Sequence, residues 1–200
     1  MIAPAGILFD LDGVIYQGDS LIDGASTAIN ALDRSNIPYC FITNTTRMTK
    51  SNLISYLNQL GLRIEPYKIF TASQAAIDYC NMKKFKKILL VVPDSEMKQD
   101  FSCFDLTDKD PDAIVLGDMG PLFNFQLLNK LFVKVMGGCQ IVAMHKNGYW
   151  MASDGLRMDL GAFVAAIEYA SGKSAIIMGK PDVNFFKMAT IGWKCPHNFI

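Results

Sequence analysis

Residues 6–15 read Gly-Ile-Leu-Phe-Asp-Leu-Asp-Gly-Val-Ile, and this stretch decides the fold. The short apolar run Ile7–Phe9 predicts a strand that is buried on both faces. We expect the strand to end at Asp10 and the chain to turn directly after Asp12. Because side chains alternate along an extended chain, Asp10 and Asp12 should point the same way while Leu11 points back into the protein. Open α/β sheets bind ligands outside the carboxyl ends of their strands, so two carboxylates here indicate a ligand site.

The same stretch has a purely structural alternative. A buried strand followed by an Asp-Gly turn with two solvated aspartates fits the pattern as well, because short motifs match by chance. The choice between the two interpretations depends on which polar residues the later strands bring to the same edge.

The composition is that of an ordinary globular protein and limits the function. Of the 200 residues, 50% are hydrophobic and 19% are charged, and the formal net charge is zero. This charge balance argues against nucleic acid or an anionic membrane as the main partner. No apolar run approaches the ~18 residues of a membrane span, and the first residues lack the pattern of a secretory signal. We therefore expect a cytoplasmic protein with neither nucleic acid nor a membrane as its partner.

The cysteines predict no metal or disulfide chemistry. They are five in number, far apart and without a Cys-x-x-Cys pair: Cys40, Cys80, Cys103, Cys139 and Cys195. We expect reduced, mostly buried thiols. A nucleophilic cysteine would need His145 or His197 as its base, and neither has a supporting context. The same shortage of histidine and paired cysteine argues against zinc.

A second apolar strand brings polar residues toward Asp10. Helical spacing predicts a helix over residues 25–34, and the strand Tyr39–Ile42 follows it. A strand-helix-strand unit of this kind favours parallel pairing, which would place Thr43 and Asn44 at the same sheet edge as Asp10.

The polar run Thr43–Thr46 has two interpretations that we expect to hold together. A helix is predicted over 47–60, so the run is a candidate N-cap. Its hydroxyls, amide and free backbone N–H groups at a helix N-terminus would also form an anion cradle. Arg47 adds charge there or is a solvated surface residue.

A second α/β pattern occupies the middle of the chain. A helix predicted over 73–81 precedes this block; within it, strands are predicted over 88–92, 112–116 and 140–144 and helices over 125–136 and 159–171. The basic run 83–87 is interpreted as a solvated loop, because the net charge is zero and no second basic patch exists. The block has enough elements for a small α/β domain of its own.

The last part of the chain returns to a strand and places a lysine after it. A strand is predicted over 174–178 and a helix over 183–191, with Pro181 suited to the first helical position. Lys180 would then lie at a helix N-terminus. An exposed loop lysine is the ordinary outcome, but beside a phosphate site the same position makes a charge clamp.

Three segments resemble the motifs of the haloacid dehalogenase-like (HAD) hydrolase superfamily. They are Phe9-Asp-Leu-Asp-Gly-Val14, Phe41-Ile-Thr-Asn-Thr45 and Gly179-Lys-Pro181, in the superfamily's order. The chain is most similar to subclass IIA, which includes NagD-like phosphatases. The resemblance implies a Rossmann-like three-layer α/β core with an inserted α/β cap of the C2 type. Too few residues separate Asp10 from Thr43 for a cap, whereas the interval from Asn44 to Lys180 has room for one.

The resemblance also implies a domain division and a set of roles. Residues 1–81 and 175–200 would form the core, and residues 82–174 the cap. Asp10 would be the nucleophile that becomes an aspartyl phosphate, and Asp12 the general acid and base. Mg²⁺ would be held by the Asp10 carboxylate and the Asp12 backbone carbonyl. The phosphate oxygens would be held by Thr43, Asn44 and Lys180.

The implied substrate is a small phosphorylated molecule or pyrophosphate. The cap would contact its leaving group through residues for which core packing or surface exposure is an equally good explanation: Asp118, His145, Lys146, Tyr149 and Trp150. A homodimer is one expected assembly, since apolar surface left uncovered could drive self-association.

One departure from the resemblance concerns the metal. The superfamily's acidic fourth motif, which follows the next core strand, has no counterpart here, and residues 198–200 are expected to begin that strand. We therefore expect a fragment or a truncated product whose Mg²⁺ lacks a ligand and whose activity is weak or absent. The alternative function is a phosphate-binding or interaction module without turnover.

Overall fold

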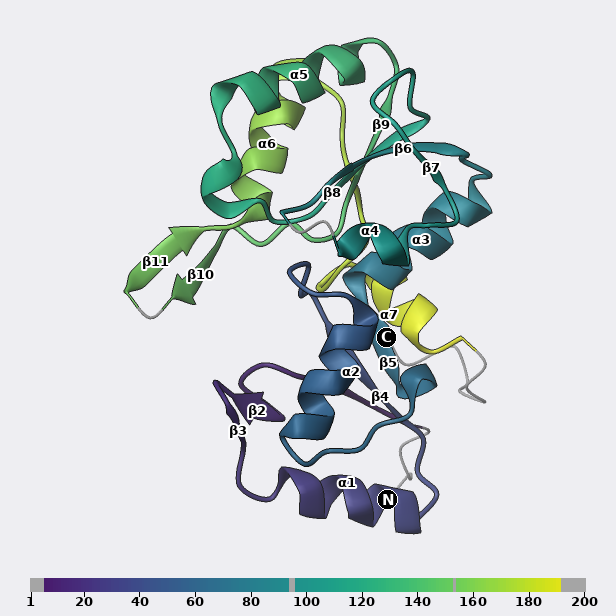
Figure 1. Cartoon of the computed structure of the whole chain (residues 1–200), viewed down its shortest axis with the longest axis vertical. Helices are drawn as coiled ribbons and strands as arrows, with labels where there is room; N and C mark the ends of the chain where they lie inside the picture. The colour runs from purple at the N-terminus through teal and green to yellow at the C-terminus, as the bar shows by residue number, and fades with distance from the viewer. Residues whose placement is uncertain (1–5, 94–95, 153, 192–200) are drawn as a thin grey trace.

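The computed structural model describes residues 6–93, 96–152 and 154–191. They form two parallel sheets that lie one above the other along the long axis of the molecule, the smaller at the bottom of Figure 1 and the larger at the top. The smaller sheet has the strand order β1-β4-β5 and the larger the order β12-β9-β8-β6-β7. The predicted strand at 198–200 lies outside the described residues.

The smaller sheet contains the first two predicted strands. β1 (Ile7–Asp10) pairs in parallel with β4 (Tyr39–Thr43), and β4 pairs in parallel with β5 (Ile69–Thr71). Helix α1 (Ala25–Arg34) has the predicted bounds, and α2 (Lys50–Gln59) begins three residues later than expected. Both helices bury their apolar stripes in one core, which is built from residues such as Ile29, Leu53 and Leu57.

The prediction that β1 is buried on both faces is wrong. All four of its residues are half-buried, whereas every residue of β4 is buried. The reason is position in the sheet: among the described residues β1 pairs with β4 alone and is an edge strand, whereas β4 has a neighbour on each side.

The larger sheet is the middle layer of three. Its strands are β6 (Lys87–Val91), β7 (Asp105–Leu106), β8 (Ala113–Leu116), β9 (Gln140–Ala143) and β12 (Ile176–Ile177). Side chains alternate across β8, so Ile114 and Leu116 pack with helices α5 (Phe125–Met136) and α6 (Leu160–Ser171). Ala113 and Val115 face the other way and pack with α3 (Ala72–Met82).

The chain crosses back to the smaller sheet after β12. Helix α7 (Val183–Ala189) packs Phe185 against Phe70 of β5, with ring centroids 5.2 Å apart. The predicted helix over 183–191 is therefore shorter than expected. Pro181 is not at its first position, because Asp182 is the N-cap and accepts a hydrogen bond from the Asn184 N–H. The domain division at 81 and 174 stays a prediction; β12, which lies beyond residue 174, pairs with β9.

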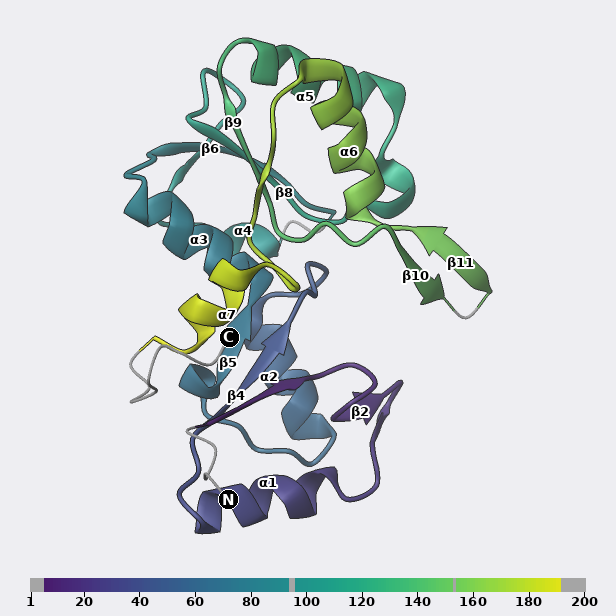
Figure 2. The same cartoon turned by 180° about the vertical axis from the view of Figure 1, so that it is seen from behind.

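Several short elements have no counterpart in the sequence prediction. They include two hairpins, β2 (Tyr16–Gln17) with β3 (Ser20–Leu21) and β10 (Tyr149–Ala152) with β11 (Gly155–Met158), the helix α4 (Met97–Asp100) and the 3₁₀ turns Pro66–Lys68 and Gly120–Leu122. The hairpin β10–β11 projects to the side of the larger sheet in Figures 1 and 2. Within the described ranges, no helix has the length and apolar character to cross a membrane.

Candidate active site

A cavity of about 580 Å³ lies where parallel strands of both sheets end. Five strands each bring at least one lining residue to it, at the strand's last position or shortly after: Asp10 of β1, Thr43 of β4, Asp118 after β8, His145 after β9 and Lys180 after β12. The other lining residues are Asp12, Tyr16, Asn44, Thr45, Thr46, Arg47, Asn147, Trp150, Asp159 and Pro181. The carboxyl ends of parallel strands are the usual ligand-binding edge of α/β proteins.

The two aspartates of the first motif share this cavity, as expected. Leu11 is fully buried and anchors the turn between them. The Asp10 carboxylate accepts a hydrogen bond of 2.8 Å from the Leu11 N–H, which fixes one of its oxygens. Asp12 is exposed, and the chain turns after it through Gly13 at φ 74°. Glycine adopts this left-handed conformation without steric cost.

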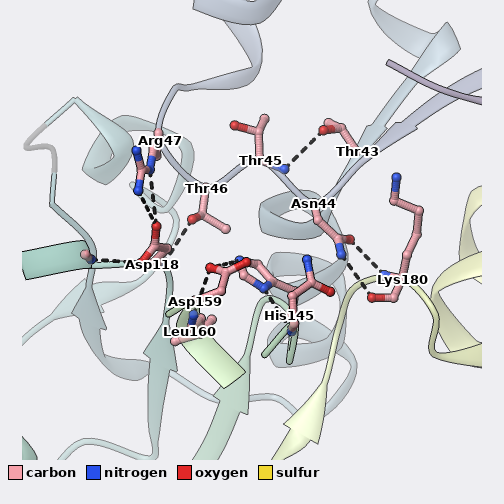
Figure 3. A network of polar contacts seen from close by, with 12 residues as sticks. Thr43, Asn44, Thr45, Thr46, Arg47, Asp118, His145, Asp159, Leu160 and Lys180 are labelled. Atoms are coloured by element: carbon pink, nitrogen blue, oxygen red, sulfur yellow. Dashed lines mark hydrogen bonds and ion pairs between the residues drawn. The ribbon is translucent and has the colours of Figure 1, made fainter. Parts of the chain in front are cut away.

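Lys180 reaches Asp10 from the other sheet. Its Nζ lies 2.5 Å from Asp10 Oδ1, and its side chain is mostly buried. Its backbone is held by Asn44, whose amide makes two hydrogen bonds to the Lys180 N–H and carbonyl, of 2.8 and 2.9 Å (Figure 3). The ammonium of Lys180 is thus paired directly with the carboxylate that ends β1, at the rim of the cavity.

Thr43 is buried at the end of β4, and its hydroxyl accepts a hydrogen bond from the Thr45 N–H. The expectation that residues 43–46 cap a helix is wrong. Helix α2 begins at Lys50, and its N-cap is Thr49, which accepts from the Asn52 N–H. Thr43 ends β4, and residues 44–46 form a loop along the cavity, so any anion binding there would use loop N–H groups and hydroxyls and not a helix dipole.

Arg47 connects this loop to the larger sheet. Its guanidinium pairs with Asp118 at 2.6 Å and stacks over Trp150, with Cζ 4.9 Å from the ring centroid. The Thr46 hydroxyl accepts a hydrogen bond from the Asp118 N–H, as Figure 3 shows. Of the two interpretations of Arg47, a charge at the site and a solvated residue, the structure therefore favours the first.

His145 and Asp159 form a buried pair on the opposite wall. The His145 Nε2 lies 3.8 Å from Asp159 Oδ1, and its Nδ1 accepts a hydrogen bond from the Asn147 N–H. Burial lowers the pKa of His145 below its usual value of 6.5, although Asp159 acts in the opposite direction. Asp159 also caps α6 by accepting from the Leu160 N–H.

Two of the five candidate cap residues do not line the cavity. Lys146 pairs with Glu168 of α6 at 2.5 Å, and Tyr149 is exposed on the hairpin β10–β11. Asp118, His145 and Trp150 do line it.

Four lining residues are not among those that the sequence predicts for the site: Tyr16, Asn147, Asp159 and Pro181. Tyr16 lies beside Asp12, and burial together with that carboxylate raises its pKa to about 12. Tyr16 and Pro181 had a sequence signal, since Tyr16 closely follows the first motif and Pro181 belongs to the third. Asn147 and Asp159 reach the cavity through the packing of α6 against the loop after β9.

The donors available to a metal are carboxylates. The described residues contain no group of three or more His, Cys, Asp or Glu that could hold a metal ion. Asp10 and Asp12 supply two carboxyl groups at the cavity. Mg²⁺ commonly uses one or two carboxylates and completes its shell with waters and substrate phosphate, so this oxygen-only pair fits a hard cation better than zinc.

Comparison with known proteins assigns the family. The family model "Haloacid dehalogenase-like hydrolase" matches residues 7–107. Haloacid dehalogenase-like hydrolase domain-containing protein 2 of Homo sapiens is 34% identical over 189 residues, covering 94% of this chain and 71% of that protein. Phospholysine phosphohistidine inorganic pyrophosphate phosphatase of Homo sapiens is 29% identical over 190 residues, covering 92% and 69%.

A solved structure shares the fold. The 4-nitrophenylphosphatase of Thermotoga maritima superposes with a TM-score of 0.86 at 22% identity, covering 96% of this chain and 74% of that one. The sequence matches and the shared fold agree with the three motifs, and the chain belongs to the haloacid dehalogenase-like hydrolase family.

Proposed function

We propose that this protein is a Mg²⁺-dependent phosphatase that hydrolyses a small phosphorylated substrate, or pyrophosphate, through an aspartyl-phosphate intermediate. The observation that carries the proposal is the convergence of Asp10, Thr43 and Lys180 on one cavity, with Lys180 Nζ 2.5 Å from Asp10 Oδ1. The names of the relatives, a pyrophosphate phosphatase and a 4-nitrophenylphosphatase, support this substrate class.

The reaction uses the two carboxylates in sequence. The Asp10 carboxylate attacks phosphorus, the bond from phosphorus to the leaving oxygen breaks, and Asp12 gives that oxygen a proton. Asp12 then takes a proton from a water molecule, whose oxygen attacks phosphorus and releases phosphate and the free Asp10 carboxylate. Asp12 is exposed at the cavity and so is accessible to that water.

The phosphate oxygens would be held by cationic and hydroxyl groups. Lys180 would exchange its ion pair with Asp10 for one with an equatorial oxygen, where negative charge spreads in the transition state. The Thr43 hydroxyl and the N–H groups of the loop after β4 are close enough to the same cavity to contribute. The Asp10 carboxylate and the Asp12 backbone carbonyl would hold Mg²⁺, which when bound would neutralise phosphate charge.

Residues 82–174, which contain most of the larger sheet together with α5 and α6, would act as a C2-type cap. Asp118, His145 and Trp150, which line the cavity from this part of the chain, would contact the leaving group. Four free cysteines among the described residues suit a reducing compartment, so the cytoplasm is the proposed location.

A phosphate-binding module without turnover is the second candidate. It is favoured by the lack, in the described part of the chain, of any group of three or more His, Cys, Asp or Glu side chains that could hold a metal ion. Such a protein would bind phosphate analogues with Lys180 and Thr43 but would not complete the reaction.

The test compares hydrolysis and binding in one preparation. Release of p-nitrophenol and of phosphate from pyrophosphate is measured with Mg²⁺ and with EDTA, and binding of vanadate is measured by calorimetry. If the protein is a phosphatase, turnover should depend on Mg²⁺, and Asp10→Asn should abolish it without changing the circular dichroism spectrum. Vanadate binding without hydrolysis would favour the module, and retained turnover in Asp10→Asn would exclude Asp10 as the nucleophile.

A further inference from the structure

The Asn44 side chain makes two hydrogen bonds to the backbone of Lys180, which lies 136 positions further along the chain. Its Nδ2 donates to the Lys180 carbonyl at 2.9 Å, and its Oδ1 accepts from the Lys180 N–H at 2.8 Å. Figure 3 shows the two bonds side by side. A single amide that binds both the N–H and the C=O of one residue fixes the orientation of that residue as well as its position.

The segment before Lys180 approaches the same place from the larger sheet. The Met178 N–H donates to the Ala143 carbonyl at 2.8 Å, which continues the β9–β12 ladder by one bond. A Cβ at Gly179 would overlap the Met144 carbonyl oxygen and the Asn44 Oδ1. The backbone therefore passes through a gap that only glycine fits, with Met144, the residue after β9, on one side and Asn44 on the other.

The position of the Lys180 ammonium depends on how its backbone is held. Lysine has four rotatable bonds and loses much rotamer freedom when its ammonium is held at one point. Here Nζ is held 2.5 Å from Asp10 Oδ1, and Asp10 ends β1, which pairs with β4, the strand that Asn44 directly follows. Asn44 thus links the backbone of the cation to the strand beside the carboxylate.

We propose that Asn44 is a positioning residue whose side chain holds Lys180 in place, and not a direct ligand of the phosphate through that side chain. The proposal rests on the proposed function for the meaning of Lys180 in catalysis, but the clamp itself is a property of the free protein. It revises the phosphate-binding role that the resemblance implies for the Asn44 side chain.

A double-mutant cycle separates the two roles. Asn44→Ala should lower kcat/KM for p-nitrophenyl phosphate about 10- to 30-fold, the loss that corresponds to two neutral hydrogen bonds. In a Lys180→Ala background the same change should cost less than about threefold, since no ammonium remains to be placed. An equal loss in both backgrounds would show that Asn44 acts on the substrate independently and would overturn the proposal.

Two further variants serve as a substitute and a control for Asn44→Ala. Asn44→Asp keeps the size of the side chain and the acceptor for the Lys180 N–H, but it puts an oxygen against the Lys180 carbonyl. It replaces Asn44→Ala in the cycle if that variant does not fold, and its loss of kcat/KM should likewise be smaller in the Lys180→Ala background. Asn184→Ala is the matched control, because Asn184 is exposed in the first turn of α7 close to the same segment. It should leave kcat/KM unchanged.

A second readout does not need activity. Hydrogen exchange of the Lys180 amide, measured by NMR on the substrate-free protein, should speed up at least tenfold in Asn44→Ala and stay unchanged in Asn184→Ala. If Lys180→Ala has no effect on turnover, the proposed function fails while this exchange still reports the clamp. Unchanged exchange in Asn44→Ala would refute the clamp whatever the activity.

Discussion

The Arg47 guanidinium lies 2.6 Å from the Asp118 carboxylate and joins the loop after β4 to the loop after β8. Asp118 is only 5% exposed, and it also accepts a hydrogen bond from the Gly120 N–H. Arg47 is about half exposed, so water already screens part of this ion pair. The ion pair therefore stabilises the charge of Asp118, which has little access to solvent, more than it stabilises the charge of Arg47.

Removal of the arginine should destabilise the protein through the aspartate left behind. Arg47→Ala is expected to lower the free energy of unfolding by about 1–3 kcal/mol, because a buried carboxylate loses its charged partner. In the double variant Arg47→Ala, Asp118→Asn the loss should be smaller than the sum of the single losses. Urea denaturation measures the free energy of unfolding of the wild type, the two single variants and the double variant. Arg63→Ala, an exposed arginine, is the control and should change stability by less than about 0.5 kcal/mol.

The elements that the sequence predicted well have strong periodic patterns. The spacing of apolar residues gave α1 and α5 with their observed bounds, and the apolar runs located β4, β8 and β9 to within one or two residues. The convergence of Asp10 and Thr43 followed from parallel pairing, which sends strand ends to one edge.

The features that the sequence could not give depend on tertiary contacts. The hairpin β10–β11 carries exposed apolar residues such as Met151 and Leu156, which a pattern does not distinguish from core residues. Thr49, and not the run 43–46, caps α2, because several polar residues compete and packing decides where the helix begins. The bonds from Asn44 to Lys180 join distant segments, and no local signal reports them.

Substitution of Asp12 should affect substrates according to their leaving groups. If Asp12 protonates the leaving oxygen, Asp12→Asn is expected to lower kcat/KM for an alkyl phosphate about 100-fold or more. The loss for p-nitrophenyl phosphate should be smaller, since p-nitrophenolate leaves without a proton. Steady-state kinetics on both substrates measure the ratio. Asp19→Asn, on the exposed turn between β2 and β3, is the control, and equal losses on the two substrates would contradict the general-acid role.

Trp150 should select the leaving group, whereas its neighbour Tyr149 should not. Trp150 lines the cavity beneath the Arg47 guanidinium, and Tyr149 is 70% exposed on the same strand. Trp150→Ala is expected to raise KM for p-nitrophenyl phosphate about three- to tenfold through loss of an aromatic contact. KM for pyrophosphate should change less, and Tyr149→Ala should alter neither value. Equal shifts for both substrates would argue against contact with the leaving group.

His145 should make the protein less stable in mild acid. Burial lowers its pKa in the folded state below 6.5, so between that lowered pKa and 6.5 the unfolded chain binds more protons. The contribution of neutral His145 is therefore fully present above pH 6.5 and is lost as the pH falls below it. Urea denaturation between pH 7.5 and 5 should show this slope, and His145→Gln should reduce it. An unchanged slope in His145→Gln would assign the acid sensitivity to other groups.

Gly179→Ala should damage both stability and turnover, because the added methyl group has no space. A Cβ at Gly179 would overlap the Met144 carbonyl oxygen and the Asn44 Oδ1, and neither backbone nor clamped amide can yield cheaply. We expect a loss of about 1–3 kcal/mol in the free energy of unfolding, together with a lower kcat as Lys180 moves from Asp10. Gly148→Ala is the matched control, since a Cβ there meets no atom within 4 Å. Thermal denaturation and p-nitrophenyl phosphate kinetics on both variants give the comparison. Equal behaviour of the two would mean that the segment before Lys180 shifts freely, and the geometry that places the ammonium on Asp10 would then not depend on close packing at Gly179.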